Sequence, residues 1–193
     1  MYSIITLNVL NMKRKTFLTA LTLLPMFKAV AKINFRFFSP SCKTQQDQEG
    51  PFYKKGSPMR NVIGQGGTAL TIKGKILKAS DCATPVSNAT LDIWHCDSQG
   101  NYDSQGFKCR GMVRTDNSGN YTFATIFPPP YGSRPRHIHF KVRAEGYPEL
   151  TSQIYFKGDP KINNDFAKNA NPDRIIELVK VNEELNGQFN IYI

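Results

Sequence analysis

This chain of 193 residues lacks repeated or compositionally uniform segments. It has no internal repeat, no low-complexity tract and no run of five basic residues, which excludes repeat arrays and charged nucleic-acid-binding tails. Hydrophobic residues make up 40% of the chain, so the bulk of it is not disordered. The length suits one domain with a proper hydrophobic core.

The formal net charge of +10 is the one feature that suggests a nucleic-acid partner. Four of the basic residues fall within residues 1–31, and removing that stretch leaves 21 basic and 15 acidic residues. The remaining basic residues are scattered along the chain. We therefore expect no nucleic-acid partner.

Acidic residues are missing from residues 1–31, and this segment has the order of an export signal. A basic cluster at residues 13–15 precedes an apolar run of 11 residues, 17–27, which is too short to span a bilayer. Residues 29–31 supply a small-x-small cleavage pattern, and Met12 could be the true start. We expect a signal peptide over residues 1–31 and a secreted or periplasmic protein with no stable membrane partner after cleavage. An uncut membrane anchor is the alternative, and the Sec and twin-arginine routes both stay open.

The four cysteines include no pair with the C-x-x-C spacing that is typical of zinc sites. An even count in an exported chain favours two disulfides, and three pairings are possible. Because Cys96 and Cys109 flank a loop between two strand-like runs, we favour Cys96–Cys109, which leaves Cys42–Cys82. Free buried thiols are the alternative.

No amphipathic helix pattern of 12 residues stands out, and alternation with a period of two dominates instead. This pattern predicts an all-β fold, an antiparallel β-sandwich with little helix, over residues 51–193. Residues 32–50 form a linker or N-terminal arm, and residues 164–171 could hold one short helix. The predicted strands are residues 70–77, 89–94, 112–115, 121–124, 137–142, 150–156, 175–181 and 189–193.

Only three histidines are present, and His137 and His139 are separated by a single residue. In a strand, residues i and i+2 point to the same face, so the two imidazoles would lie side by side and could hold one metal ion. Just upstream, the prolines at 128–130 stiffen the chain before Tyr131, and Arg134 follows. Taken singly, such residues are also common on solvated strands and in packed loops.

Five ordered segments together resemble the intradiol ring-cleavage dioxygenases, the family of catechol 1,2-dioxygenase and protocatechuate 3,4-dioxygenase. Their order along the chain makes the match far more specific than any one segment. The segments are residues 49–53 (EGPFY), 91–102 (LDIWHCDSQGNY), 130–132 (PYG), 134–140 (RPRHIHF) and 150–156 (LTSQIYF).

The resemblance implies a non-haem Fe(III) ion held by Tyr102 and Tyr131 as tyrosinates and by His137 and His139 as imidazoles. The chemistry agrees, because a hard, highly charged ferric ion suits anionic oxygen donors.

The resemblance also implies catalytic roles for Tyr131, which takes a proton from the substrate, and for Arg134, which stabilises developing negative charge. It implies that Gln153 orients ligands or substrate. The implied reaction consumes O2 and opens a catechol between its hydroxyl-bearing carbons, giving a cis,cis-muconate-type dicarboxylic acid.

Two other interpretations fit parts of the sequence. A non-enzymatic, exported transthyretin-like sandwich that binds a ligand would explain the strands and the leader, although not the order of the motifs. A zinc or copper site on His137 and His139 would use the paired imidazoles alone. The short segment between Tyr131 and His137 also suggests an open pocket.

Overall fold

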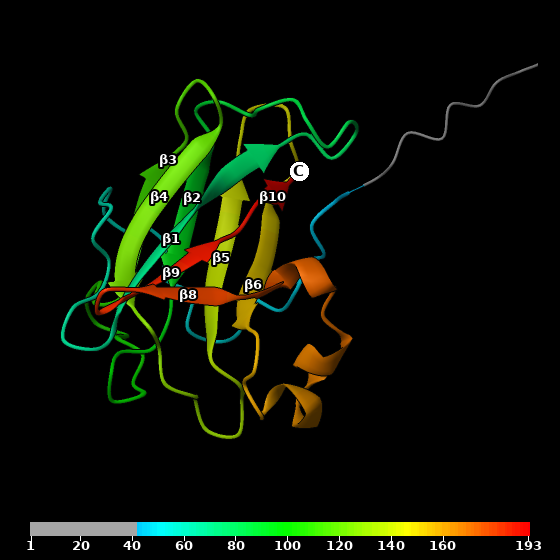
Figure 1. Ribbon diagram of the computed structural model, residues 1–193. Helices are drawn as coiled ribbons and strands as arrows, with labels where there is room; N and C mark the ends of the chain where they lie inside the picture. The colour runs from blue at the N-terminus through cyan, green and yellow to red at the C-terminus, as the bar shows by residue number, and fades with distance from the viewer. Residues whose placement is uncertain (1–41) are drawn as a thin grey trace, which may run out of the picture. The chain divides into compact units, whose positions relative to one another are not determined.

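The structure, a computed structural model, describes residues 42–193, and within them the chain forms ten strands and three short 3-10 helices (Figure 1). The predicted signal peptide, residues 1–31, lies outside the described residues. Across the described part of the chain, no helix has the length and apolar character needed to cross a membrane.

The first sheet has the strand order β3-β2-β5-β6-β7. Its strands are β2 (Thr90–Trp94), β3 (Arg110–Arg114), β5 (His137–Arg143), β6 (Leu150–Phe156) and β7 (Ile175–Ile176). Backbone register places Trp94 opposite His139 and His139 opposite Gln153, so three central strands bring these side chains into one row.

The second sheet is built around the long strand β1, which pairs with β4, β9 and β10. Strand β8 pairs with β9. The strands are β1 (Ala69–Leu77), β4 (Asn120–Ile126), β8 (Leu178–Val181), β9 (Glu184–Gln188) and β10 (Ile191–Tyr192).

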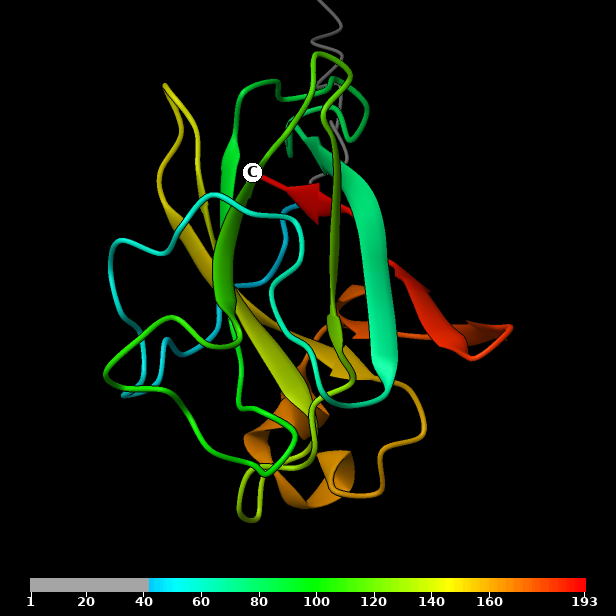
Figure 2. The same ribbon diagram turned by 90° about the vertical axis from the view of Figure 1, so that its left-hand side faces the viewer.

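The hydrophobic core lies between these two layers, which Figure 2 shows from the side. Alternate residues supply it: Ile138 and Phe140 of β5 are at most 1% exposed, as are Ile72 of β1 and Phe123 of β4. Since strand residues alternate between faces, the histidines that flank Ile138 project from the outer face of the first sheet.

The all-β sandwich is confirmed, but a purely antiparallel arrangement was wrong because both sheets are mixed. Strands β9 and β10 pair in parallel with β1, and β7 pairs in parallel with β6. The predicted strand 175–181 is two strands: β7 ends at Ile176 in the first sheet, and β8 begins at Leu178 in the second. The chain therefore changes sheets at Glu177.

The segment before β7 forms three 3-10 helices in place of the single short helix expected within residues 164–171. Asp165 interrupts it in an extended conformation (φ −121°, ψ 166°), and its side chain accepts a hydrogen bond from the Ala167 backbone N–H. This cap ends one helix and begins the next. The helices are η1 (Ile162–Asn164), η2 (Phe166–Asn169) and η3 (Pro172–Arg174).

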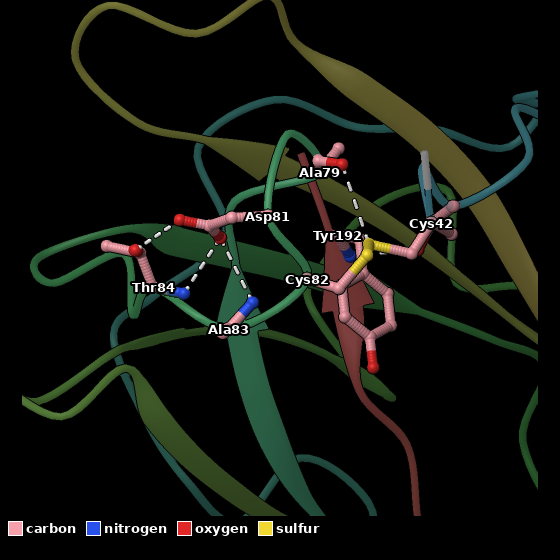
Figure 3. Close-up of a disulfide and its surroundings, with 8 residues drawn as sticks. Cys42, Ala79, Asp81, Cys82, Ala83, Thr84 and Tyr192 are labelled. Carbon is pink, nitrogen blue, oxygen red and sulfur yellow. Dashed lines mark hydrogen bonds between the residues drawn. A yellow bond between two sulfur atoms is a disulfide. The ribbon is translucent and has the colours of Figure 1, made fainter. Parts of the chain in front are cut away.

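One of the two expected disulfides is present. Cys42 and Cys82 are joined, and Figure 3 shows this bond beside Tyr192. The Cys96–Cys109 pairing was wrong, because both thiols are buried and free. The backbone places Cys109 next to His95, whose N–H donates to the Cys109 carbonyl (3.2 Å), while the Cys96 thiol donates to the Pro129 carbonyl (3.6 Å).

The segment of residues 42–60, here called the arm, begins within the predicted N-terminal arm (residues 32–50), extends ten residues past it and runs over the outer face of the first sheet. Its Asp47 N–H donates to the Thr151 carbonyl of β6 (3.0 Å), and its Arg60 N–H donates to the Met112 carbonyl of β3 (2.9 Å). Between these points Tyr53 packs on Trp94 of β2, with ring centroids 4.9 Å apart. The arm therefore covers the face from which the paired histidines project.

Candidate metal centre

A pocket of about 160 Å³ opens between the arm and the outer face of the first sheet. All four side chains that the resemblance implies as metal ligands line it, together with Arg134. Its lining residues are Gly50, Pro51, Phe52, Tyr102, Tyr131, Arg134, His137 and His139.

The two histidines lie side by side on β5, as the alternation of strand residues requires. Each is 3% exposed, and their ring centroids are 4.8 Å apart. Trp94, on the neighbouring strand, stacks on His139 with an interplanar angle of 8°. A buried aromatic wall therefore fixes the plane of the second imidazole.

A hydrogen bond from Nδ1 orients the ring of His137. Its Nδ1 lies 2.7 Å from the Pro135 carbonyl oxygen, which can only accept, so Nδ1 carries the proton. Its Nε2 then presents a lone pair toward Tyr102, whose hydroxyl lies 3.1 Å away. A backbone acceptor behind a ring nitrogen is the arrangement that commonly orients histidines on metals.

The two tyrosines come from separate loops and meet at the pocket. Their rings are 5.1 Å apart and nearly perpendicular, and Phe52 of the arm stacks on Tyr102 at 4.3 Å. A hydrogen bond from Lys161 to the Gly132 carbonyl (2.7 Å) holds the loop that carries Tyr131. Gly132 has a positive φ of 56°, which a glycine adopts without strain.

Arg134 and Gln153 occupy different positions relative to this pocket. Arg134 lines it, whereas Gln153 is fully buried behind Arg134 and is not among the lining residues. The Gln153 side-chain oxygen accepts from Arg134 Nη2 (3.1 Å), and its amide donates to the Gln48 carbonyl of the arm (2.8 Å). Gln153 thus connects Arg134 to the arm.

Burial determines the protonation of the lining groups in the protein alone. Burial lowers the pKa of His137 to about 4 and the pKa of His139 well below its usual value, so both imidazoles are neutral and can donate lone pairs. Burial also raises the pKa of Tyr102, although the cations of Arg134 and Arg110 oppose this. The Tyr102 phenolate therefore needs further positive charge, which a bound metal ion would supply.

The donor set fits ferric iron better than zinc. Two phenol oxygens and two imidazoles converge here, and the His139 Nδ1 atom is buried without a hydrogen bond. Throughout residues 42–193, no three His, Cys, Asp or Glu side chains come together in a way that could hold a metal ion. A site on His137 and His139 alone thus lacks the carboxylate or thiolate that commonly completes zinc sites.

The segment 49–53 is one of the family motifs, but its sequence alone does not place Gly50, Pro51 and Phe52 in the pocket wall. Their position depends on where the arm crosses the sheet, and short-range patterns do not report this. The one available signal was the Gly-Pro pair itself, which marks a fixed turn.

Residues 48–192 match the sequence profile of a family described as "Dioxygenase". The chain belongs to the intradiol ring-cleavage dioxygenases. It is 32% identical over 166 residues to catechol 1,2-dioxygenase 2 of Acinetobacter lwoffii, covering 71% of this chain and 59% of that protein. The chain thus spans little more than half the length of this curated relative.

Solved structures agree with this family. The dioxygenase domain of a dioxygenase carbohydrate-binding protein fusion from Streptomyces sp. SirexAA-E superposes with a TM-score of 0.73 at 33% identity, over 78% of this chain and 97% of that one. 3-Chlorocatechol 1,2-dioxygenase from Rhodococcus opacus 1CP gives a TM-score of 0.70 at 25% identity, over 76% and 71% of the two chains.

Proposed function

We propose that this chain is an exported enzyme that uses Fe(III) and O2 to open a catechol-type ring between its hydroxyl-bearing carbons, giving a cis,cis-muconate-type dicarboxylic acid. The observation that carries the proposal is the convergence of Tyr102, Tyr131, His137 and His139 on one small pocket. Catechol and chlorocatechol dioxygenases among the relatives support it. The leader-like composition of residues 1–31 supports export.

The pocket suits a single aromatic ring. Its volume of about 160 Å³ is close to that of an engineered apolar cavity of about 150 Å³ that binds benzene in another protein. The lining contains one cation, Arg134, and Asp165 already pairs with it (3.2 Å). Asp165 balances this charge, and the lining holds no second cation for a substrate carboxylate, so we expect catechols without a carboxylate to be the better substrates.

Ferric iron bound by the four side chains would supply a Lewis acid that chelates the diol and makes its ring reactive toward O2. The protein's own residues supply proton transfer. The Tyr131 hydroxyl makes no hydrogen bond within the described residues, and its ring packs edge-on against the rings of Phe52 and Tyr102. With no other partner among the described residues, a Tyr131 phenolate could take a proton from a substrate hydroxyl and become a neutral phenol.

Tyr102 and Arg134 have fixed positions by contrast. The Tyr102 hydroxyl lies against His137 Nε2, and Phe52 covers its ring, so it stays in place while the substrate binds. Arg134 lines the same pocket, where its positive charge would stabilise negative charge that develops on the ring.

Turnover tests the proposal directly. Purified protein reconstituted with Fe(III) is incubated with catechol in air, while O2 uptake and the ultraviolet absorbance of muconate are followed. We expect one O2 consumed per cis,cis-muconate formed, strong loss of turnover in Y102F, and normal turnover in Y147F, a tyrosine outside this pocket. Absence of any ring-opened dicarboxylic acid from catechol, protocatechuate and hydroxyquinol would favour a non-enzymatic binding module.

A further inference from the structure

The guanidinium of Arg134 is held on one side only. Its Nε and Nη2 atoms face the two carboxylate oxygens of Asp165, at 3.2 and 3.3 Å, in a bidentate pair. The same Nη2 also donates to Gln153 Oε1 and to the Tyr155 hydroxyl, both at 3.1 Å. Within residues 42–193, Nη1 makes no hydrogen bond and remains available to the pocket that Arg134 lines.

An aromatic ring fixes the plane of the same guanidinium. The Arg134 Cζ atom lies 4.1 Å from the ring centroid of Phe166, which is 40% exposed. Phe166 is not part of the buried hydrophobic core, and its contact with Arg134 is a cation–π stack. The stack restricts rotation of the guanidinium about its long axis, which hydrogen bonds in one plane do not restrict fully.

The backbone in turn holds Asp165. Its carboxylate accepts from the Ala167 N–H (2.9 Å), as the N-cap of η2, and its side chain is 9% exposed. Lys161 and Asp159, just before η1, tie this segment to the loop that carries Tyr131, through the Gly132 carbonyl (2.7 Å) and the Arg136 N–H (2.8 Å). Residues 159–166 therefore form one segment that supports both Arg134 and the loop that carries Tyr131 (Figure 1, the golden-orange segment after β6).

We propose that Asp165 and Phe166 are positioning residues, which hold Arg134 so that its Nη1 edge faces the substrate. This inference rests on the proposed function, because it gives Arg134 a charge-stabilising role. A guanidinium that is free to rotate would present its charge in the right place only part of the time. Fixing it before the substrate arrives removes that reorganisation cost from the reaction.

The test is a double-mutant cycle on the iron-loaded enzyme with catechol: wild type, D165N, R134K and D165N/R134K. Asparagine caps helices about as well as aspartate, so D165N keeps the N-cap and loses the charged bidentate pair. We expect D165N to lower kcat by roughly 10- to 100-fold with KM changed less than about threefold, because misplacement affects the transition state most. In the R134K background, which lacks the planar fork, D165N should cost less than about threefold.

Two further variants separate positioning from folding. F166L removes the ring but keeps an apolar side chain, and we expect a loss of roughly three- to tenfold in kcat with unchanged thermal stability. F166Y keeps the ring and should retain wild-type kcat. E177Q, in an exposed ion pair with Lys157, should match wild type.

The outcomes are distinct. Equal losses from D165N in both backgrounds would show that Asp165 acts independently of Arg134 and would overturn the inference, as would wild-type kcat in both D165N and F166L. If D165N fails to fold, F166L and F166Y decide the question. An inactive wild type would contradict the proposed function itself, whereas an active wild type without coupling would contradict this inference alone.

Discussion

Gly50 determines how closely the arm approaches the paired histidines. Its φ is +71°, and a Cβ placed there would lie 3.4 Å from His139 Cε1, within the wall of the pocket. A side chain at this position would therefore strain the backbone, and its first carbon would contact the His139 ring at the pocket wall.

We predict that G50A destabilises the protein by about 1–2 kcal/mol, the cost of placing an L-residue in the left-handed region. It should also raise KM for catechol several-fold, because the methyl group narrows the pocket. Urea denaturation and steady-state kinetics measure the two effects.

G56A is the matched control on the same arm. Gly56 has a φ of +91°, and no described atom lies within 4 Å of a Cβ there. The backbone cost should be similar while KM stays unchanged. A KM that rises equally in both variants would show that arm strain, and not the added methyl group, affects substrate binding.

Individual residues were predictable where the chemistry is local. The i, i+2 rule placed both imidazoles on one face of β5, and the prolines before Tyr131 marked a stiff loop. Asp165 was not predictable as a partner of Arg134, because 31 residues and a change of element separate them. The free thiols of Cys96 and Cys109 were missed because the register of β2 and β3, which spacing alone does not reveal, places Cys109 beside His95.

At the scale of elements, one buried lysine on β5 attaches the arm to the sheet. Lys141 Nζ lies 2.7 Å from Glu49 of the arm and 2.7 Å from Glu149, and the lysine side chain is 6% exposed. Burial opposes its charge, but the hydrogen bonds that Lys141 donates to Glu149 and Glu49 raise the pKa of Lys141. Glu49 directly precedes Gly50, so this ion pair holds the part of the arm that lines the pocket.

We predict that K141M lowers the free energy of unfolding by about 1–2 kcal/mol. The loss is smaller than for a fully buried ion pair, because both carboxylates are more than two-fifths exposed and can rehydrate. KM for catechol should rise as the arm loosens. K157M, which removes an exposed pair with Glu177, should change stability by less than about 1 kcal/mol. An unchanged KM in K141M would mean that other contacts hold the arm over the pocket.

Strands with clear alternation were predictable to within a few residues, and β6 matched at both ends. Strand β9 was missed, because its sequence, ELNGQ, has no β-branched or aromatic residue. Its strand conformation comes from pairing with β1 on one side and β8 on the other. The 3-10 helices likewise depend on the side chain of Asp165, which supplies a cap in the middle of the segment.

For the whole molecule, the Cys42–Cys82 disulfide ties the start of the arm to the turn after β1. The two cysteines are 40 residues apart in sequence, and cross-linking a loop of that length restricts the unfolded chain. We predict that C42S/C82S lowers the free energy of unfolding by about 2–4 kcal/mol, measured by urea denaturation. Treatment of the wild type with a reductant should give a similar loss, and an unchanged stability in both would contradict the role of this bond.

The central claim is that Tyr102, Tyr131, His137 and His139 bind one ferric ion. The visible absorption spectrum after loading with Fe(III) tests it most directly, because charge transfer from tyrosinate to ferric iron colours the protein. We predict a visible band at one bound iron per chain, shifted or weakened in both Y102F and Y131F and unchanged in Y147F. A colourless protein with iron bound, or an identical band in all three variants, would contradict the claim.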